Sequence, residues 1–184
     1  MSEKTEKTKD SAKTEKPDVK LALATFKERA IAALVDYGII FGIYVVGIIL
    51  QIAIGYVPIV GGWLSWLLGM LIYVAGLAAM FYIFIWMPFK KDGQTIGKKM
   101  QNIKIMIVAD PEKWTLQPVG EEDLTAMILR GIIGWIEASI VFGLLAWYFI
   151  TNDKNSQRLA DQLGKTVVVQ VDPETKVPLK KPRA

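Results

Sequence analysis

The sequence predicts an all-α integral membrane protein. It consists of an antiparallel transmembrane hairpin, a third membrane segment that either spans the bilayer or re-enters it, and a small cytoplasmic β element. Hydrophobic residues make up 52% of the 184 residues, and they gather in long runs that carry almost no charge. The 22 basic and 18 acidic residues lie mostly in polar blocks between these runs. This alternation is typical of membrane proteins and not of a soluble globular domain.

The composition also excludes several kinds of chemistry. The chain has no cysteine, which removes disulfides, thiolate nucleophiles and zinc–cysteine sites. It has no histidine, which removes the usual general base and the usual pH switch. We therefore expect no enzyme activity, no metal site and no cofactor. Carboxylates and arginines remain as the carriers of function.

Two polar segments precede the first apolar run. Residues 1–20 are rich in Lys, Glu, Thr and Ser and contain no aromatic residue, so they predict a disordered tail. Residues 21–29 predict a short interfacial helix that leads into the bilayer. The apolar run that follows comes too late, and is too long, for a secretory signal.

The two membrane spans of the hairpin are the clearest elements. Residues 30–57 form one apolar run, and Asp36 is its only charged residue. Residues 63–87 form a second run with no charge, and tryptophans lie at both of its ends, as expected at the headgroup level. Each run exceeds the roughly 20 residues that a helical span needs. The short apolar connection between them predicts an antiparallel hairpin.

The second half of the chain alternates between polar and apolar segments. Residues 102–109 are rich in β-branched residues and predict a strand that stops at an Asp-Pro turn, and residues 114–116 predict a second short strand. Residues 124–150 form the third hydrophobic segment. Residues 166–171 (TVVVQV) predict another strand, and residues 172–184 predict a disordered basic tail. The membrane domain is thus expected to cover residues 21–171.

The distribution of lysine and arginine predicts the orientation. Eight such residues precede the first span, none lies in the first connection, seven lie in the second connection and seven in the C-terminal tail. The positive-inside rule therefore places the N-terminus and the second connection in the cytoplasm. Three simple crossings would leave the equally basic tail outside. If residues 102–109 pair with residues 166–171, the third segment must instead enter and return, and the sequence leaves both alternatives open.

Four short motifs resemble those of the RDD family of membrane proteins. In order, they are residues 29–36 (RAIAALVD), residues 92–99 (DGQTIGKK) with the strand that follows, Leu129-Arg130, and residues 158–161 (RLAD) with the strand at 166. The resemblance covers residues 26–171, and Ala160 stands where many relatives have histidine. For some family members transport has been proposed, including cation–proton exchange, and the resemblance implies no more than that.

Charged residues inside the membrane segments are the candidate site. A carboxylate such as Asp36 costs about 2.5–3.5 kcal/mol at the centre of a membrane helix, so it needs a partner. Arg29 shares its helix face but lies about 10 Å away along the axis. We predict one network that joins Arg29, Asp36, Arg130, Glu137 and Asp161. This network is either a structural clamp between helices or an ion and proton site.

Two further sets of residues have expected roles. Gly38 and Gly42, and likewise Gly134 and Ala138, are small residues four apart that favour close helix packing, within the chain or between copies. Four lysines are expected to contact lipid headgroups or to retain the loop in the cytoplasm. They are Lys90, Lys91, Lys98 and Lys99. Their loop does not match the spacing of a nucleotide-binding loop, so no nucleotide is expected.

Two hypotheses for function follow from the sequence. The first is a transporter or transporter-like subunit that handles a monovalent cation or proton through intramembrane carboxylates. The alternative is a non-transporting scaffold or assembly factor that binds other membrane proteins. The expected partners are the lipid bilayer and either further copies of the chain or other membrane proteins, with no nucleic acid. The predicted location is a multi-pass position in the membrane with a cytoplasmic N-terminus.

Overall fold

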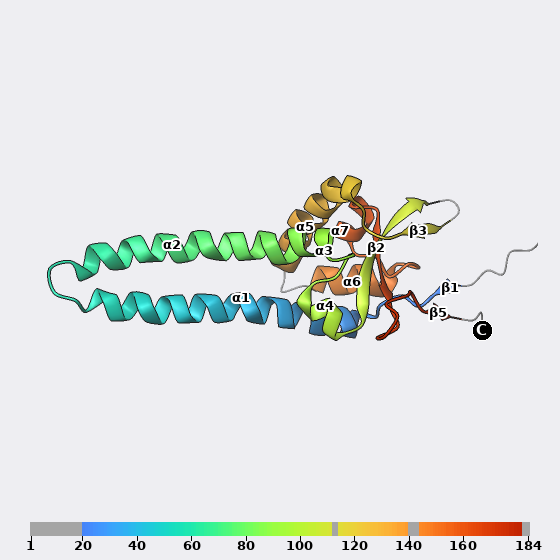
Figure 1. The fold of residues 1–184 in the computed structure, drawn as a ribbon. Coiled ribbons are helices and arrows are strands. Elements are labelled where there is room, and N and C mark those ends of the chain that lie inside the picture. The colour runs from blue at the N-terminus through green and yellow to red at the C-terminus, as the bar shows by residue number, and fades with distance from the viewer. Residues whose placement is uncertain (1–19, 112–113, 140–143, 182–184) are drawn as a thin grey trace, which may run out of the picture.

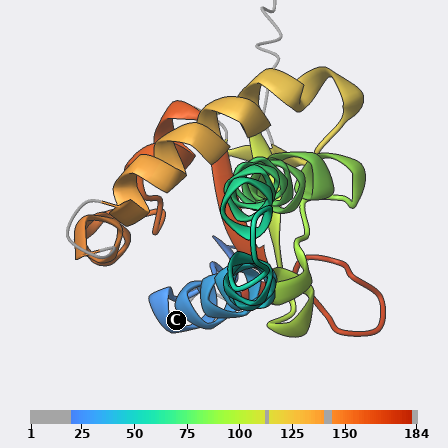
Figure 2. The same ribbon diagram turned by 90° about the vertical axis from the view of Figure 1, so that its left-hand side faces the viewer.

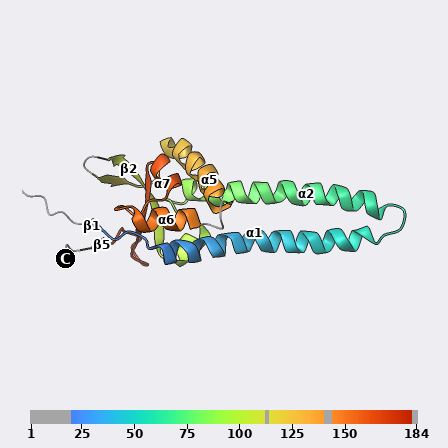
Figure 3. The same ribbon diagram turned by 180° about the vertical axis from the view of Figure 1, so that it is seen from behind.

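The computed structural model describes residues 20–111, 114–139 and 144–181. Two parts are evident: a long helical hairpin and a smaller unit of short helices and strands at its open end (Figures 1 and 3). We call the second part the head. The predicted fold is confirmed in its coarse form, since the chain is mostly helical with two long apolar helices and a small three-stranded sheet.

The hairpin consists of α1 (Phe26–Gly55) and α2 (Gly61–Phe81). Helix α1 starts at a capping box, because the Glu28 amide donates to the Thr25 hydroxyl at 3.3 Å and the Glu28 carboxylate accepts from the Thr25 amide at 2.8 Å. The turn at residues 56–60 includes Ile59 at a φ of 69°. By length and composition, two helices of the described chain can cross a membrane, residues 26–55 and 61–90.

Helix α2 continues without a break through a π-helical turn. The turn, η1 (Tyr82–Trp86), leads into α3 (Met87–Lys90). The Met87 amide donates to the Tyr82 carbonyl five residues earlier, and the next residue, Pro88, has no amide to donate. The wider turn places Phe84 against Tyr37 of α1, with ring centroids 4.8 Å apart.

The two helices of the hairpin contact each other through glycines other than the predicted pair. A side chain at Gly47 would come within 2.9 Å of Ile72, and one at Gly76 would overlap Tyr44. At Gly38 and Gly42, by contrast, nothing in the described chain lies within 4 Å of an added Cβ. The prediction that these two residues pack within the chain is therefore wrong. Their contact with another copy stays a prediction.

The sheet of the head has the order β3-β2-β4. Strand β2 (Ile103–Asp110) pairs antiparallel with both β3 (Thr115–Gln117) and β4 (Thr166–Gln170), with Ile105 opposite Val168. Both faces of β2 are covered: one face packs against Met127 and the start of α1, and Leu21 and Leu23 pack on the other. The pairing of these two distant segments, which the sequence left open, is present in the structure.

The ends of the described chain differ from the prediction. The Ala24 amide donates to Val168 and the Gln170 amide donates to Ala22, so residues 21–25 are extended. The predicted interfacial helix at residues 21–29 is therefore wrong for residues 21–25, whereas residues 26–29 form the first turn of α1. Residues 172–181, expected to be disordered, fold back in a turn. There β5 (Lys180–Lys181) pairs with β1 (Lys20–Leu21). Residues 1–19 and 182–184, also predicted to be disordered, lie outside the described residues.

The third hydrophobic segment turns back at the head. A short helix, η2 (Glu121–Asp123), leads into α5 (Leu124–Ser139), and α6 (Leu144–Asn152) follows at an angle of 114°. Figure 2 shows the hairpin end-on and α5 running across its axis. Because β2 and β4 pair, both ends of this segment lie in the head. Of the two predicted alternatives, the one in which the two strands pair is the one that the structure contains.

Candidate functional site

Asp161 is the centre of a buried cluster of arginines. It lies in the short helix α7 (Leu159–Leu163) and has no exposed surface. One carboxylate oxygen accepts from Arg29 of α1 at 2.8 Å, and the other accepts from Arg130 of α5 at 2.8 Å and faces Arg158 at 3.5 Å. Three separate segments of the chain, α1, α5 and α7 with its N-cap residue Arg158, therefore meet at one carboxylate. We call this group the clamp.

The arginines of the clamp also bind the sheet. Arg29 donates from Nε to the Ala24 carbonyl at 3.2 Å and from a terminal nitrogen to the Val168 carbonyl of β4 at 3.4 Å. Arg130 donates to the Thr166 hydroxyl at 3.1 Å, also in β4. The clamp thus fastens the first turn of the hairpin to the third segment and to the sheet.

The charge of Asp161 is held by its neighbours. Burial alone would raise the pKa of this carboxyl, but the positive charges of Arg130, Arg158 and Arg29 outweigh burial and keep the pKa well below its usual range. Asp161 is therefore ionised at any physiological pH. Its negative charge stays available to balance the arginines.

Glu137 of α5 lies at the edge of the clamp. Its Oε1 accepts from the Ala160 amide at 3.3 Å, and its Oε2 lies 3.8 Å from Nε of Arg158. Among the described residues, Oε2 is the only buried side-chain oxygen or nitrogen without a hydrogen-bond partner. Glu137 therefore reaches the clamp through Arg158, a residue that the predicted network did not include.

Asp36 belongs to a separate group of contacts. Its two oxygens accept from the Thr95 hydroxyl at 2.5 Å and from the Gly97 amide at 2.8 Å. Thr95 also caps α4 (Ile96–Met100) by accepting from the Lys98 amide. Asp36 therefore holds the start of α4 against α1. The prediction of a single network is wrong, because Asp36 makes no direct contact with the four residues that meet at or beside Asp161.

Gly97 explains why α4 can approach α1 so closely. A Cβ at this position would overlap the backbone carbonyl of Ala32, which cannot move without shifting the helix. The residue at this contact must therefore lack a side chain. This requirement accounts for the Thr-x-Gly spacing at residues 95–97. The threonine caps α4, and the glycine allows α4 to lie directly against the backbone of α1.

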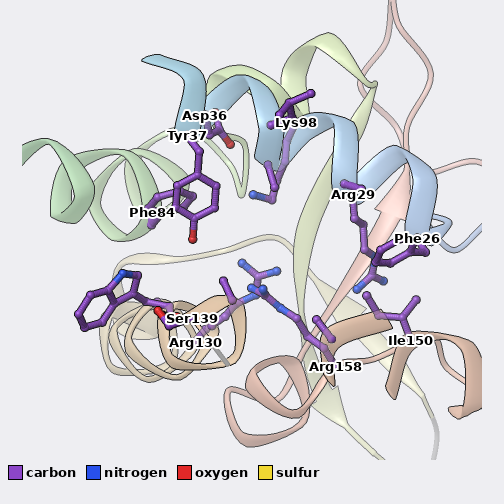
Figure 4. A pocket seen from close by; sticks show the side chains of 18 residues that line it. Phe26, Arg29, Asp36, Tyr37, Phe84, Lys98, Arg130, Ser139, Ile150 and Arg158 are labelled. Carbon is purple, nitrogen blue, oxygen red and sulfur yellow. Dashed lines mark hydrogen bonds between the residues drawn. The ribbon is translucent and has the colours of Figure 1, made fainter. Parts of the chain in front are cut away.

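A cavity of about 620 Å³ lies between the Asp36 contacts and the clamp. Figure 4 shows Lys98 on one side, Arg130 and Arg158 on the opposite side, and Tyr37 with Phe84 at one end. The charged lining consists of four cations and one carboxylate, and the rest is mostly apolar. The charged residues are Arg29, Asp36, Lys98, Arg130 and Arg158.

The comparison with protein families decides the identity of the chain. Residues 23–165 match the RDD family, which is most of the sequence. The chain belongs to the RDD family. No curated protein and no solved structure matches it. Asp36, Asp161 and all their side-chain partners lie within the part that matches the RDD family, so the RDD region contains both the clamp and the contacts that hold α4.

The four lysines of this RDD chain have different surroundings. Lys98 is partly buried and lines the cavity, unlike the exposed lysines of the same loop, and its contact with a lipid headgroup stays a prediction. Burial and the nearby charge of Arg130 lower its pKa to about 7. Lys90 lies over the rings of Trp86 and Phe89. Lys91 and Lys99 are exposed, and their contact with lipid stays a prediction.

Gly134 and Ala138 face the cavity instead of packing two helices together. Both line it, and a Cβ at Gly134 would come within 2.8 Å of the Arg158 guanidinium. The small residues of α5 in this RDD chain thus make room for the side chain of Arg158. The expectation of helix packing at this pair is replaced by contact with an arginine.

Three residues of the site were missed by the sequence reasoning, and each had a usable signal. Arg158 lies three positions before Asp161, a spacing that brings the two together at the start of a helix. Thr95 precedes a short run of helix formers, as a capping residue does. Gly97 follows it two positions later. All three belong to the motifs on which the resemblance to RDD proteins depends.

Proposed function

We propose that this RDD chain is an integral membrane protein whose α1/α2 hairpin crosses the lipid bilayer, with the head on the cytoplasmic side. The two apolar helical stretches, at 30 residues each, are about 45 Å long, more than the roughly 30 Å of a hydrocarbon core. Lysines lie at the head end of the hairpin and are absent from its far turn, which supports this orientation.

We further propose that the chain is a non-transporting scaffold that binds other membrane proteins. The observation that carries this proposal is that the carboxylates of both aspartates already bind groups of the protein itself. Each oxygen of Asp36 and of Asp161 already accepts a hydrogen bond from the protein. A cation would have to compete with these donors for the carboxylate oxygens. The carboxylates therefore hold segments of the chain together. The positively charged side chains that line the cavity also repel cations.

A second candidate, handling of protons or monovalent cations, is favoured by one observation. Asp36 and Lys98 line the same cavity, and Lys98 has a pKa of about 7, where it can exchange a proton. Since two helices enclose no pathway, this candidate requires several copies of the chain. It is the weaker candidate because both oxygens of Asp36 already accept hydrogen bonds from Thr95 and Gly97.

Flux into proteoliposomes distinguishes the two candidates. Purified wild-type chain and Asp36→Asn would be reconstituted at equal density, with Glu174→Gln as an exposed control. Absence of Na⁺, K⁺ and H⁺ flux above empty vesicles supports the scaffold. Flux that Asp36→Asn abolishes while insertion and melting stay unchanged would overturn it. Cross-linking in native membranes is the positive test, since a strict monomer without a co-purifying partner contradicts a scaffold.

The orientation can be tested separately, because the chain has no native cysteine. Single cysteines at Ile59, in the exposed turn of the hairpin, and at Glu174, in the head, are the informative pair. We expect a membrane-impermeant maleimide applied from outside to modify Ile59→Cys only. Modification of Glu174→Cys from outside would contradict the proposed orientation.

A further inference from the structure

The positive groups that face the cavity have unused hydrogen-bond donors. Within the described residues, the Lys98 ammonium makes one long contact, 3.4 Å to the Thr95 hydroxyl, and no ion pair. Arg130 and Arg158 contact the clamp through Nε, and their terminal nitrogens make no hydrogen bond in the described chain. Figure 4 shows these groups facing each other across the cavity.

The charge of this region is also unbalanced. Four cations, Arg29, Lys98, Arg130 and Arg158, line the cavity, and three carboxylates lie among or behind them. The oxygens of Asp36 and Asp161 are occupied by protein donors, and Glu137 is covered by Ala160 and Arg158. When Lys98 is protonated, at least one positive charge is therefore left without a counter-charge in a partly buried space. An anion placed between Lys98 and the two arginines would remove this cost.

The remainder of the wall fits a hydrocarbon chain. Phe84, Trp135 and Leu34 line the cavity on the side of the hairpin. Leu34 is 73% exposed and Trp135 is 50% exposed, so this side opens onto the apolar surface of α1 and α5. A ligand that is anionic at one end and apolar at the other matches both parts of the wall. The volume of about 620 Å³ lies within the usual range for small-molecule sites.

We propose that this cavity binds the phosphate group of an anionic phospholipid, with Lys98, Arg130 and Arg158 as donors and the acyl chains leaving along Leu34 and Trp135. A phosphate diester carries the single negative charge that the site lacks, and its oxygens accept from guanidinium and ammonium groups alike. This inference rests on the proposed membrane location. It does not depend on whether the chain transports ions.

Lipid binding to the delipidated chain in neutral detergent tests the site, since it requires neither flux nor a partner. The probes are phosphatidylglycerol and phosphatidylcholine with identical acyl chains, and the readouts are bound lipid by native mass spectrometry and the shift in melting temperature. We expect a clear preference of the wild type for phosphatidylglycerol. Lys98→Gln should weaken phosphatidylglycerol binding about fivefold, the effect of one lysine beside an anionic headgroup.

Two matched variants locate the effect in the cavity. Lys154→Gln removes an exposed charge outside the cavity and should leave the preference unchanged. Ala138→Phe fills the cavity without changing any charge, so it should reduce lipid binding as strongly as Lys98→Gln. Equal binding of the two lipids by the wild type, or equal effects of Lys98→Gln and Lys154→Gln, would overturn the proposal.

The source of the phosphate is tested with soluble anions. Inorganic phosphate and glycerol 3-phosphate carry the same chemistry without acyl chains. We expect millimolar concentrations of either to leave the melting temperature unchanged and to leave bound phosphatidylglycerol in place. Stabilisation by inorganic phosphate equal to that by phosphatidylglycerol would overturn the lipid as ligand. A flux result of either sign leaves these outcomes unaffected, so failure of this inference and failure of the proposed scaffold are distinguishable.

Discussion

The hairpin and the head differ in how much of their side-chain surface the chain itself buries. In the head, the side chains of β2 and β4 are buried on both faces, and charged residues such as Asp161 are enclosed by partners. In the hairpin, only 11% and 17% of the most apolar stretches of the two helical arms are buried. Large apolar side chains such as Phe41 and Ile59 are open to the surroundings.

This difference shows where each part obtains its stability. The head is held by its own contacts, so the loss of a single buried partner should be costly. The hairpin has few internal contacts, so its apolar surface must be covered by something outside the chain, which in the proposed setting is lipid. The clamp and the Asp36 contacts lie at the border between the two parts. Substitutions at this border therefore test most directly whether the head and the hairpin differ in what stabilises them.

The largest effect is expected from Asp161→Asn. Removing this charge leaves the buried Arg130 and the partly buried Arg29 and Arg158 without their shared counter-charge, and breaking a buried ion pair costs about 3–5 kcal/mol. We expect a large drop in melting temperature in detergent and poor yield. Glu174→Gln, which removes an exposed charge from the same head, should melt like the wild type. Equal melting of the two variants would mean that the clamp does not hold the head together.

A smaller effect is expected from Gly97→Ala. The added methyl group would overlap the Ala32 carbonyl, and overpacking of this kind costs about 1–3 kcal/mol. The matched change in the hairpin, Gly42→Ala, meets open space and should stabilise α1 by up to about 1 kcal/mol through helix propensity. Chemical denaturation of both variants measures the contrast. If both substitutions changed the stability in the same direction, the proposed difference between head and hairpin would be contradicted.

Thr95→Val tests the contacts of Asp36 alone. The change keeps the shape of the side chain but removes the cap of α4 and one of the two hydrogen bonds to Asp36. We expect a loss of about 1–2 kcal/mol, as for other helix caps. Thr115→Val, at an exposed position of the edge strand β3, is the control. Limited proteolysis should show earlier cleavage near residue 96 in Thr95→Val, and an unchanged cleavage pattern would contradict the assigned role.

The smallest expected effect is a dependence of stability on pH through Lys98. Burial and the charges of Arg130 and Arg158 lower its pKa from 10.5 to about 7 in the folded chain, against the attraction of Asp36 and Asp161. Between these values the unfolded chain binds a proton that the folded chain has lost, so this residue favours folding more as pH rises. The stability difference between wild type and Lys98→Gln should therefore shift towards the wild type from pH 7 to 9. A flat difference would contradict this role.

The sequence predicted those parts of the fold that depend on local composition. The hairpin followed from two uncharged runs, and the strands at residues 102–109 and 166–171 followed from β-branched residues beside turn signals. Their pairing was one of two open alternatives, and the register in the structure decides for it. The segment at residues 21–29 was mispredicted because its conformation is fixed by hydrogen bonds to β4, far away in the sequence.

The sequence predicted most of the residues of the site, but not which of them contact one another. The seven-residue spacing of Arg29 and Asp36 places them near one face of a helix, but it does not say what faces them. Asp36 instead finds Thr95 and Gly97, through a short helix whose position depends on contact with α1. Arg158 was overlooked because no helix was predicted at residues 159–163, and it is the start of this helix that brings Arg158 to Asp161. A search for arginines beside each acidic residue would have found it.

The order in which the clamp residues appear in the chain has a consequence for biosynthesis. Arg29 precedes its partner Asp161 by 132 residues. At roughly 5–20 residues per second, a ribosome releases Arg29 about 7–26 s before Asp161. Both arms of the hairpin are therefore complete while Arg29 still lacks its counter-charge. The clamp closes only when α7 emerges, so a nascent chain interrupted before Asp161 keeps an unpaired arginine that quality-control factors can recognise.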